Sequence, residues 1–410
     1  MFVSFDDLLN LPQVRVVDAV LTETEITLQV EHTQHFAICH KCGARATEFF
    51  RNGEKLLLRH LPIFNRPVFL MLQTKRYRCL HCGATTTQQG QWYDAQAHCT
   101  TAFAEFLLLE LVNSTISDVV SKHQVSYDLL RGVLTRYVSG KVDWSQFEQL
   151  RMLGLDEISL RTGHRDFVTI VSAQDEAGRP VVLAVLKGRE KQTVIDFLKT
   201  IPAHLQGTIR EVCSDLYEGF INAVEEVLPQ AKVVADRFHV AKLYRAAVDE
   251  LRKVELKELK QILKKDEYSG LKGVLWMLRK NADNLEPEEK EILDLLFDAS
   301  PLLRKAYQLR EKLTRIFDKE QTKQSGRQAI RRWMTEVRQS GLNCFDKFLG
   351  TLEKHLDIIT NYFISRSSSG WVEGLNNKIK VLKRRCYGLT NISNLFRRIW
   401  LDLNGTTAFA

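Results

Sequence analysis

The chain has 410 residues, of which 44% are hydrophobic and 26% charged, as in ordinary globular proteins and unlike disordered ones. Lys and Arg number 58 against 50 Asp and Glu, and the net charge of +8 is compatible with nucleic acid but too common to identify a partner. The sequence has no run of eighteen apolar residues and no signal-peptide pattern. Membrane insertion and secretion are therefore not expected, and a cytoplasmic location is predicted.

Residues 1–99 are predicted to form a zinc-ribbon domain. Alternation of apolar and polar residues within the first thirty indicates a pair of half-buried strands. Two CxxC pairs follow, each succeeded by glycine, with 36 residues of strand-like sequence between them. In a reducing compartment, four thiolates at this spacing favour a tetrahedral Zn²⁺ site over four unligated core cysteines. The predicted ligands are Cys39, Cys42, Cys79 and Cys82, whereas Cys99, Cys213, Cys344 and Cys386 are expected to be packing residues.

The pattern becomes helical over residues 100–145. One helix is predicted within 100–113, a second after the capping pair Ser114-Thr115, and a third after Ser126. A short helix, a tight turn and a longer helix carrying Arg131 and Arg136 indicate a helix-turn-helix that binds DNA. A generic three-helix bundle explains this stretch about equally well because the turn contains no glycine. The zinc ribbon and the basic stretch at 51–78 favour DNA binding.

An alternating α/β pattern begins at Met152. Its element order, three strands and then helix-strand-helix-strand-helix, is the one expected for a ribonuclease H-like core. The fold class predicted for the whole chain is multidomain α+β. Strands are predicted at 152–158, 166–173, 180–186, 209–213 and 231–235, and helices at 191–200 and 217–227. Three segments follow from this order. The first part of the core would comprise residues 146–240, an all-helical insertion residues 241–362, and the completion of the core residues 363–410.

Carboxylates stand at the ends of these apolar runs. Three runs end on Asp156, Asp215 and Asp236, and Glu373 heads a strongly basic segment far downstream. The first and fourth strands of such a core are neighbours, so Asp156 and Asp215 are expected side by side, with Glu373 completing the cluster. Carboxylates this close stay charged only around cations, which predicts two Mg²⁺ or Mn²⁺ ions and in-line phosphoryl transfer. For Asp156 or Asp215 alone, a loop cap would be the simpler interpretation.

The segment Asp236-Arg-Phe-His239 has two interpretations. His239 and Asp236 can form a supporting pair in which the histidine contacts a phosphate or orients a carboxylate. The same spacing fits an aspartate that caps a helix with a histidine in its first turn equally well. Glu157 is expected to point away from Asp156, toward solvent.

The segment after Glu373 is predicted to bind DNA phosphates. Seven Lys and Arg and no acidic residue lie between 376 and 398, with Ile379, Val381 and Leu382 placed for packing and Arg397 and Arg398 extending the basic surface. Residues 365–370 are expected to be a flexible entry that becomes ordered on DNA. The DNA-contacting residues predicted here are Asn377, Lys378, Lys380, Lys383, Arg384 and Arg385.

With these elements in order, the chain resembles DDE-type insertion-sequence transposases of the ISL-three family over essentially its whole length. The resemblance rests on CHKCG and CLHCG, LGLDEISLRTGHRDFVTIV, CSDLYEGFINAVEEVLPQAKVVADRFHVAK and SRSSSGWVEGLNNKIKVLKRRCYGLTN. It implies cleavage and strand transfer of double-stranded DNA by Asp156, Asp215 and Glu373. It also implies that the N-terminal domains bind terminal inverted repeats. A homodimer or larger assembly on DNA is expected from the need to join two ends, and the protein would be nucleoid-associated.

Two other functions remain open at this level. A DNA-binding regulator with an inactive nuclease-like core would use the zinc ribbon and helix-turn-helix alone, but such a core has no reason to keep three clustered carboxylates. A ribonuclease or Holliday-junction-type nuclease could use the same core, but DNA-binding modules at the chain's beginning fit it less well. Because Mg²⁺-dependent cleavage of element-end DNA is expected only of the transposase, that reaction separates the three.

Overall fold

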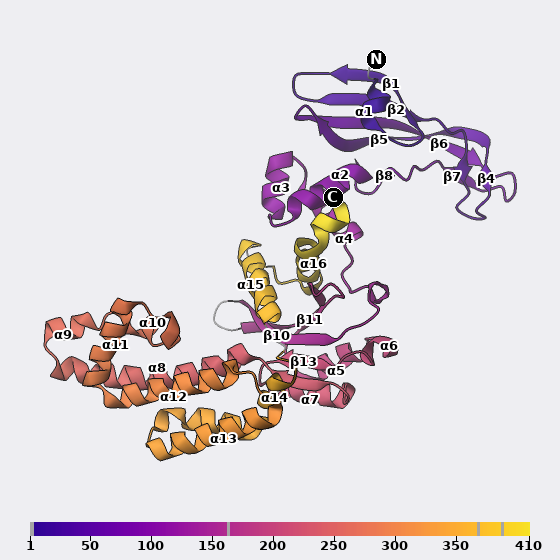
Figure 1. The fold of residues 1–410 in the computed structure, drawn as a ribbon. Coiled ribbons are helices and arrows are strands. Elements are labelled where there is room, and N and C mark those ends of the chain that lie inside the picture. Colours follow the sequence, from indigo (N-terminus) through magenta and orange to yellow (C-terminus); the bar gives the residue numbers. More distant parts are fainter. Residues whose placement is uncertain (1–3, 162–164, 367–369, 387–388) are drawn as a thin grey trace. The chain divides into compact units, whose positions relative to one another are not determined.

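The computed structural model describes residues 4–161, 165–366, 370–386 and 389–410 (Figure 1). The chain divides into two compact units, residues 1–140 with 382–410, and residues 141–381. The first unit therefore combines segments from both ends of the sequence. Residues 363–410, which the sequence suggested as one segment, divide between the units inside helix α15 (Gly370–Arg385).

The first unit begins with a short helix, α1 (Phe5–Leu9), and a sheet whose described strands follow the order β1-β2-β6-β5-β9-β8, with β7 paired to β6. Alternation places Ile26, Leu28 and Val30 on the buried face of β2. The predicted strand pair is present as the antiparallel pair β1 and β2. The strands are β1 (Val14–Leu21), β2 (Ile26–His32), β3 (Ala37–Ile38), β4 (Arg45–Ala46), β5 (Glu48–Ile63), β6 (Arg66–Arg78), β7 (Thr85–Thr87), β8 (Tyr93–Asp94) and β9 (Cys99–Thr100).

Four helices complete this unit: α2 (Thr101–Leu111), α3 (Ile116–His123), α4 (Tyr127–Tyr137) and α16 (Ile392–Phe409). The three helices predicted from the sequence are confirmed, with Thr100, Thr115 and Ser126 as their side-chain caps. Gln124 takes the left-handed conformation, with φ +51°, that ends α3. The turn between α3 and α4 therefore forms without the glycine that its geometry favours.

The C-terminal helix α16 packs against α2, and a buried charge network fixes it there. Arg398, which is 2% exposed, donates to Leu111 O at 3.1 Å and to Ser114 O at 2.8 Å. It also pairs with Asp402, whose Oδ1 accepts from Asn113 N at 3.0 Å. The prediction that Arg398 extends a DNA-binding surface is wrong, because its guanidinium satisfies backbone carbonyls at the end of α2.

Arg397 is likewise a structural residue. Its Nε donates to Val138 O at 3.0 Å, the carbonyl that follows α4. The half-buried guanidinium also lies against Gly140, where a Cβ would come within 3.1 Å of Nη2. Arg397 is therefore only partly exposed for the basic surface that the sequence predicted.

Removing Arg398 should destabilise the first unit strongly. Arg398→Ala leaves the carbonyls of Leu111 and Ser114 without this donor, which costs roughly 1–3 kcal/mol for each buried group that stays unsatisfied. It also removes one of the two arginines that pair with buried Asp402, of which the other is Arg385. Thermal unfolding followed by circular dichroism is the measurement. The exposed Arg384→Ala is the matched control and should melt like the wild type. Equal melting of both variants would show that α16 does not depend on this network.

Within its described residues, the second unit contains a five-stranded sheet in the order β12-β11-β10-β13-β14. Strands β12, β11 and β10 are antiparallel, and β10, β13 and β14 are parallel, which confirms the predicted adjacency of first and fourth strands. Phe220 and Val224 of α7 and Val194 of α5 bury against it. The elements are η1 (Trp144–Gln146), β10 (Met152–Arg161), β11 (Arg165–Gln174), β12 (Pro180–Lys187), α5 (Lys191–Leu198), α6 (Ala203–Gln206), β13 (Glu211–Ser214), α7 (Glu218–Val227) and β14 (Lys232–Ala235).

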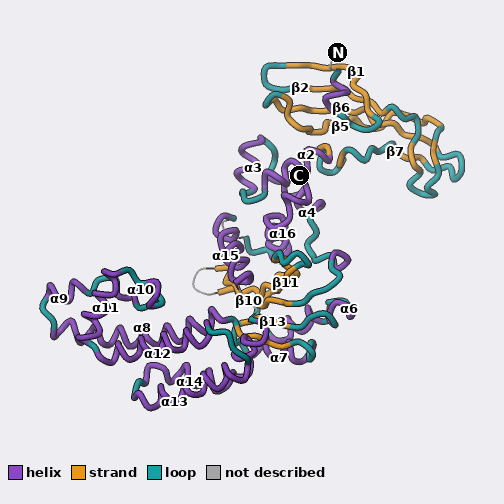
Figure 2. Tube along the Cα trace, in the orientation of Figure 1, coloured by secondary structure: helices purple, strands orange, loops and turns teal. Residues whose placement is uncertain are grey.

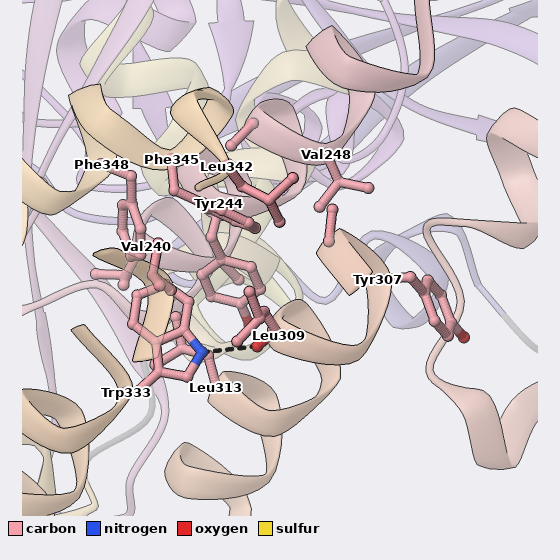
Figure 3. Packing of buried hydrophobic residues seen from close by; sticks show 14 of the residues in the cluster. Val240, Tyr244, Val248, Tyr307, Leu309, Leu313, Trp333, Leu342, Phe345 and Phe348 are labelled. Atoms are coloured by element: carbon pink, nitrogen blue, oxygen red, sulfur yellow. Dashed lines mark hydrogen bonds between the residues drawn. The ribbon is translucent and has the colours of Figure 1, made fainter. Parts of the chain in front are cut away.

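Residues 237–365, all of them described, form helices and connecting loops only (Figure 2). Their core is apolar and aromatic: Trp333, Phe345 and Phe348 pack around Tyr244, and Trp333 Nε1 donates to Leu309 O at 2.8 Å (Figure 3). The helices are α8 (Arg237–Ile262), α9 (Lys265–Gly270), α10 (Val274–Met277), η2 (Ala282–Asn284), α11 (Pro287–Ala299), α12 (Pro301–Asp318), α13 (Lys323–Ser340), η3 (Asn343–Phe345) and α14 (Asp346–Ser365).

This helical block is continuous with the sheet. Val234 and Ala235 of β14 belong to its core, and α14, kinked at His355, returns to β14, where Asn361 Nδ2 donates to Val233 O at 2.7 Å. These contacts attach the helical block to β14, the strand that immediately precedes it in the chain. None of the helices within the described residues is long and apolar enough to cross a membrane.

Candidate functional site

The four predicted zinc ligands converge. Their sulfur atoms lie within 4.8 Å of one another, with Cys39 and Cys82 at 3.6 Å and Cys42 and Cys79 at 3.6 Å. A tetrahedral site with Zn–S bonds of about 2.3 Å requires sulfur separations of about 3.8 Å. The cysteine cluster therefore has the dimensions and the donor type of a structural zinc site.

The two CxxC segments fold in the same way. Gly43 and Gly83 have φ +74° and +72°, the left-handed region in which glycine is favoured. Their N–H groups donate to Cys39 O at 2.9 Å and Cys79 O at 2.8 Å, respectively. The first segment joins β3 to β4 and the second joins β6 to β7. The glycine after each pair is thus explained by the tight turn that aims both thiols at one point.

Electrostatics within the cysteine cluster favour a cation. Backbone N–H groups, first that of Cys42, lower the pKa of Cys39 to about 6. The N–H of Ala44 also lowers the pKa of Cys42, but burial and the three neighbouring sulfur atoms outweigh it and raise that pKa to about 12. Backbone N–H groups, first that of Cys82, also lower the pKa of Cys79. Cys39 and Cys79 therefore ionise readily, whereas a further thiolate at Cys42 is resisted. A divalent cation at the centre removes this repulsion.

The aspartates stand in register at one edge of the second sheet. The parallel ladder between β10 and β13 ends with the pair Leu155 and Ser214, so Asp156 and Asp215 are the next residues on adjacent strands, which lie about 4.8 Å apart. The ladder between β13 and β14 ends one residue before Asp236, whose N–H donates to Ser214 O at 2.8 Å. Strand β10 continues past Asp156 in its pairing with β11. Asp156 is therefore at the end of the parallel ladder and not at the end of its strand.

Each of the first two aspartates is held by a backbone N–H. Asp156 Oδ1 accepts from Glu157 N at 2.7 Å, and Asp215 Oδ1 accepts from Tyr217 N at 3.1 Å. Asp156 Oδ2 also accepts from the amide Nδ2 of Asn376 on α15. Both side chains are therefore oriented before any ligand arrives.

Burial makes these charges unfavourable. It raises the pKa of Asp156 to about 6, and nearby Asp215 and Asp236 add to that effect. Burial also raises the pKa of Asp215, with further contributions from Glu157 and Asp236, whereas His239 lowers both. Buried carboxylates that repel one another bind a cation readily, because the cation offsets both the cost of desolvation and the repulsion.

The structure shows Asp236 as a helix cap and also shows a hydrogen bond between Asp236 and His239. Asp236 Oδ1 accepts from Phe238 N at 2.7 Å and so caps α8, while His239 Nδ1 donates to Asp236 Oδ2 at 3.0 Å. The hydrogen bond to Asp236 raises the pKa of His239, as do the charges of Asp156 and Asp215. A histidine that readily carries a proton thus lies within the field of all three aspartates.

Arg189 lies near the same edge of the sheet, and no pattern in the sequence predicted it there. Its guanidinium lies 5.1 Å from the ring centroids of both Phe167 and Tyr217 and binds Glu157 Oε2 at 3.0 Å. Glu157 is therefore ion-paired, whereas the sequence suggested a solvated neighbour. Gly219 lets the ring of Tyr217 lie across α7, because a Cβ there would be 2.4 Å from Tyr217 Cε1.

Helix α15 docks on β10 close to the aspartates. A Cβ at Gly154 would lie 2.8 Å from Val372 Cγ2 and 3.2 Å from Trp371 Cη2, so the glycine permits this approach. One turn further along the helix, Asn376 contacts Asp156. Glu373 occupies the turn of α15 between these contacts, but its side chain lies outside the described residues.

Convergence of metal ligands is established for the cysteines alone. In the described part of the chain they are the one group of three or more candidate ligands whose atoms all lie within 4.8 Å of one another. The described aspartates and His239 do not form such a group by themselves. The support for the predicted carboxylate cluster is therefore the pairing of β10 with β13, which makes Asp156 and Asp215 neighbours, and the position of Glu373 on α15.

The predicted DNA-contacting residues differ in exposure. Asn377, Lys378, Lys380 and Arg384 are exposed on α15, and Arg131 is exposed on α4. Lys383 is half-buried, Arg385 pairs with buried Asp402, and Arg136 pairs with Asp94 at 2.6 Å. Val381, expected to pack, is 49% exposed. Of the expected flexible entry, residues 367–369 lie outside the described residues.

Comparison with known proteins agrees with this architecture. Residues 153–399 match the model of a family described as transposases, the DDE family of ISL3 type. The chain is 29% identical over 378 residues to the transposase for insertion sequence element IS1001 of Bordetella parapertussis, covering 91% of this chain and 90% of that protein. It is 25% identical over 387 residues to the transposase for IS1557 of Mycobacterium tuberculosis, covering 90% and 86%. These similarities place the protein among the transposases.

The family model spans the sheet, the helical block and α15, which is more than half of the chain. The chain belongs to the ISL3 family of insertion-sequence transposases. Among solved structures, the Drosophila P element transposase strand transfer complex is similar with a TM-score of 0.40 and 12% identity, covering 73% of this chain and 91% of that one.

Proposed function

We propose that this chain is an active DNA transposase that cleaves the ends of an insertion sequence and transfers them to target DNA by metal-dependent phosphoryl transfer. The observation that carries the proposal is the register that puts Asp156 and Asp215 on adjacent strands at one edge of the sheet. Burial raises the pKa of both, so a purely structural use of these charges is unfavourable. Such hard oxygen donors suit Mg²⁺ or Mn²⁺.

Asp156, Asp215 and Glu373 are the residues that would hold two ions. When bound, the ions activate a water or a 3′-hydroxyl and stabilise the leaving oxygen of an in-line displacement. The backbone N–H of Glu157 and that of Tyr217 keep the two aspartates oriented.

His239 adds a positive group at this edge. Its pKa is raised mainly by its hydrogen bond to Asp236, so it carries a proton more readily than an ordinary histidine. In the proposed function the imidazolium contacts a phosphate of the bound DNA, and Asp236 fixes the direction in which it points. The prediction that this pair supports the site therefore remains compatible with its role as a helix cap.

DNA recognition is assigned to both ends of the chain. In the proposal, Zn²⁺ at Cys39, Cys42, Cys79 and Cys82 orders the ribbon, and α2 to α4 bind the terminal inverted repeats as a helix-turn-helix. The exposed cations of α15 and Arg131 contact phosphates. A homodimer or larger assembly follows from the need to join two ends.

The test is a cleavage and joining assay. Duplexes that carry the terminal inverted repeats flanking the gene, incubated with protein and Mg²⁺, should be cut at the element end and joined to a target plasmid, and EDTA should abolish both products. Repeat binding without cleavage in Mg²⁺ or Mn²⁺ would instead identify a DNA-binding regulator. Preferential cleavage of branched DNA or RNA would identify a structure-directed nuclease.

A further inference from the structure

Asn376 is a buried polar residue whose carbonyl oxygen makes no hydrogen bond within the described part of the chain. It is 2% exposed and lies on the buried face of α15 together with Leu375 and Ile379. Its Nδ2 donates to Asp156 Oδ2, and its Oδ1 has no hydrogen-bond partner among the described residues. A buried carbonyl oxygen without a donor is costly and rare in native proteins, so it requires an explanation.

The orientation of this amide is determined by its neighbour. An ionised carboxylate only accepts hydrogen bonds, so the NH₂ group of Asn376 must face Asp156 and the carbonyl oxygen must be the unpaired atom. With Glu157 N on Oδ1 and Asn376 on Oδ2, each oxygen of Asp156 has one donor and keeps lone pairs for a cation. The unpaired Oδ1 of Asn376 is an acceptor beside that carboxylate.

We propose that Asn376 is a positioning residue of the metal site: its NH₂ group fixes Asp156 as a ligand, and its free carbonyl oxygen accepts a hydrogen bond from a metal-bound water. This inference rests on the proposed function. A carboxylate held from outside the ligand set binds a cation with less loss of freedom, and removal of such a partner typically lowers metal affinity about 10- to 100-fold. Asn376 is not a ligand in this scheme, because its amide acts through Asp156 and through the water.

The chain offers matched controls for this role. Asn377 is the next residue on the same helix and is exposed, so it has the same chemistry without the contact to Asp156. Val372 anchors the same helix against Gly154 and touches neither aspartate in the described contacts. Asn377→Leu therefore controls for the substitution itself, and Val372→Ala controls for looser docking of α15. Asn376→Leu keeps the number and the branching of the side-chain heavy atoms, so the buried face of the helix remains filled.

The experiment measures Mn²⁺ binding to the zinc-loaded full-length protein without DNA, by electron paramagnetic resonance of free Mn²⁺. Asn376→Leu should weaken Mn²⁺ binding about 10- to 100-fold, and should raise the Mg²⁺ concentration for half-maximal cleavage by a similar factor with a smaller effect on the rate at saturating Mg²⁺. Asn377→Leu should match the wild type in Mn²⁺ affinity, which is measured without DNA.

Two outcomes would overturn the inference: wild-type Mn²⁺ affinity in Asn376→Leu, or an equal loss in Val372→Ala, which would make Asn376 a helix anchor only. Asp215→Asn separates this failure from that of the proposed function. If Asp215→Asn binds Mn²⁺ like the wild type, the metal site itself is misassigned. If it loses Mn²⁺ while Asn376→Leu does not, only the role of Asn376 is disproved.

Discussion

Replacing Asp215 with asparagine should lower DNA cleavage at least about a thousandfold and leave terminal-repeat binding intact. The substitution keeps the shape and the acceptor for Tyr217 N but removes the charge that would hold a divalent ion. Loss of roughly 4 kcal/mol of transition-state stabilisation by the metal corresponds to that factor. Single-turnover cleavage of element-end duplexes measures the first effect, and a gel-shift titration measures the second.

Stability gives this prediction a second readout. Because burial raises the pKa of Asp215, its ionised form disfavours the folded, metal-free protein, so Asp215→Asn should melt at the wild-type temperature or above it. Asp175→Asn is the control: this aspartate lies in the turn between β11 and β12 and pairs with Arg179. It should cleave normally. Full cleavage by Asp215→Asn would remove this residue from the proposed site.

Loss of the cysteine cluster should abolish specific DNA binding without inactivating the core. The part of the first unit around the CxxC segments has a very small core, which consists of Cys39 and Cys79 themselves with Ala37, Ala46 and Tyr77. Apparent metal-binding free energies of about 10–16 kcal/mol stabilise structural zinc sites of this kind. Cys79→Ser should therefore reduce zinc from one per chain to a small fraction and weaken terminal-repeat binding at least about a hundredfold, measured by elemental analysis and fluorescence anisotropy.

The control for this experiment is a cysteine outside the cluster. Cys344 lies in η3 of the helical block, and burial raises its pKa to about 11, which suits a packing residue and not a ligand. Cys344→Ser should keep one zinc per chain and normal DNA binding. If Cys79→Ser kept both properties as well, the cysteine cluster would have no structural role for the metal.

The features that the sequence predicted correctly depend on interactions between residues close together in the chain. Side-chain caps such as Thr115 and Ser126 act on the next three residues, so the helices of the N-terminal unit were predictable from short windows. The glycine after each CxxC pair likewise specifies a tight turn within five residues. Strand order in the second sheet was also predictable, because short connections and helical crossovers leave few topologies.

Boundaries between domains were less predictable. The basic pattern continues from α15 into α16, and nothing in it distinguishes a charge that contacts DNA from one that is buried. Arg398 belongs to the second kind, since its partners Leu111 and Ser114 are almost three hundred residues away in the chain. A C-terminal helix that packs on α2 cannot be inferred from either segment alone, because the contact depends on both surfaces.

By itself the sequence determined the helices, the cysteine spacing, the strand order and the identity of the acidic candidates, all of which depend on neighbours a few residues away. Only the tertiary structure decided that Asp156 precedes the end of its strand, that Asp236 is both a cap and a partner of His239, and that Asn376 holds Asp156. The physical reason is that register and burial arise from packing between distant segments. The same packing determines the cost of a buried charge.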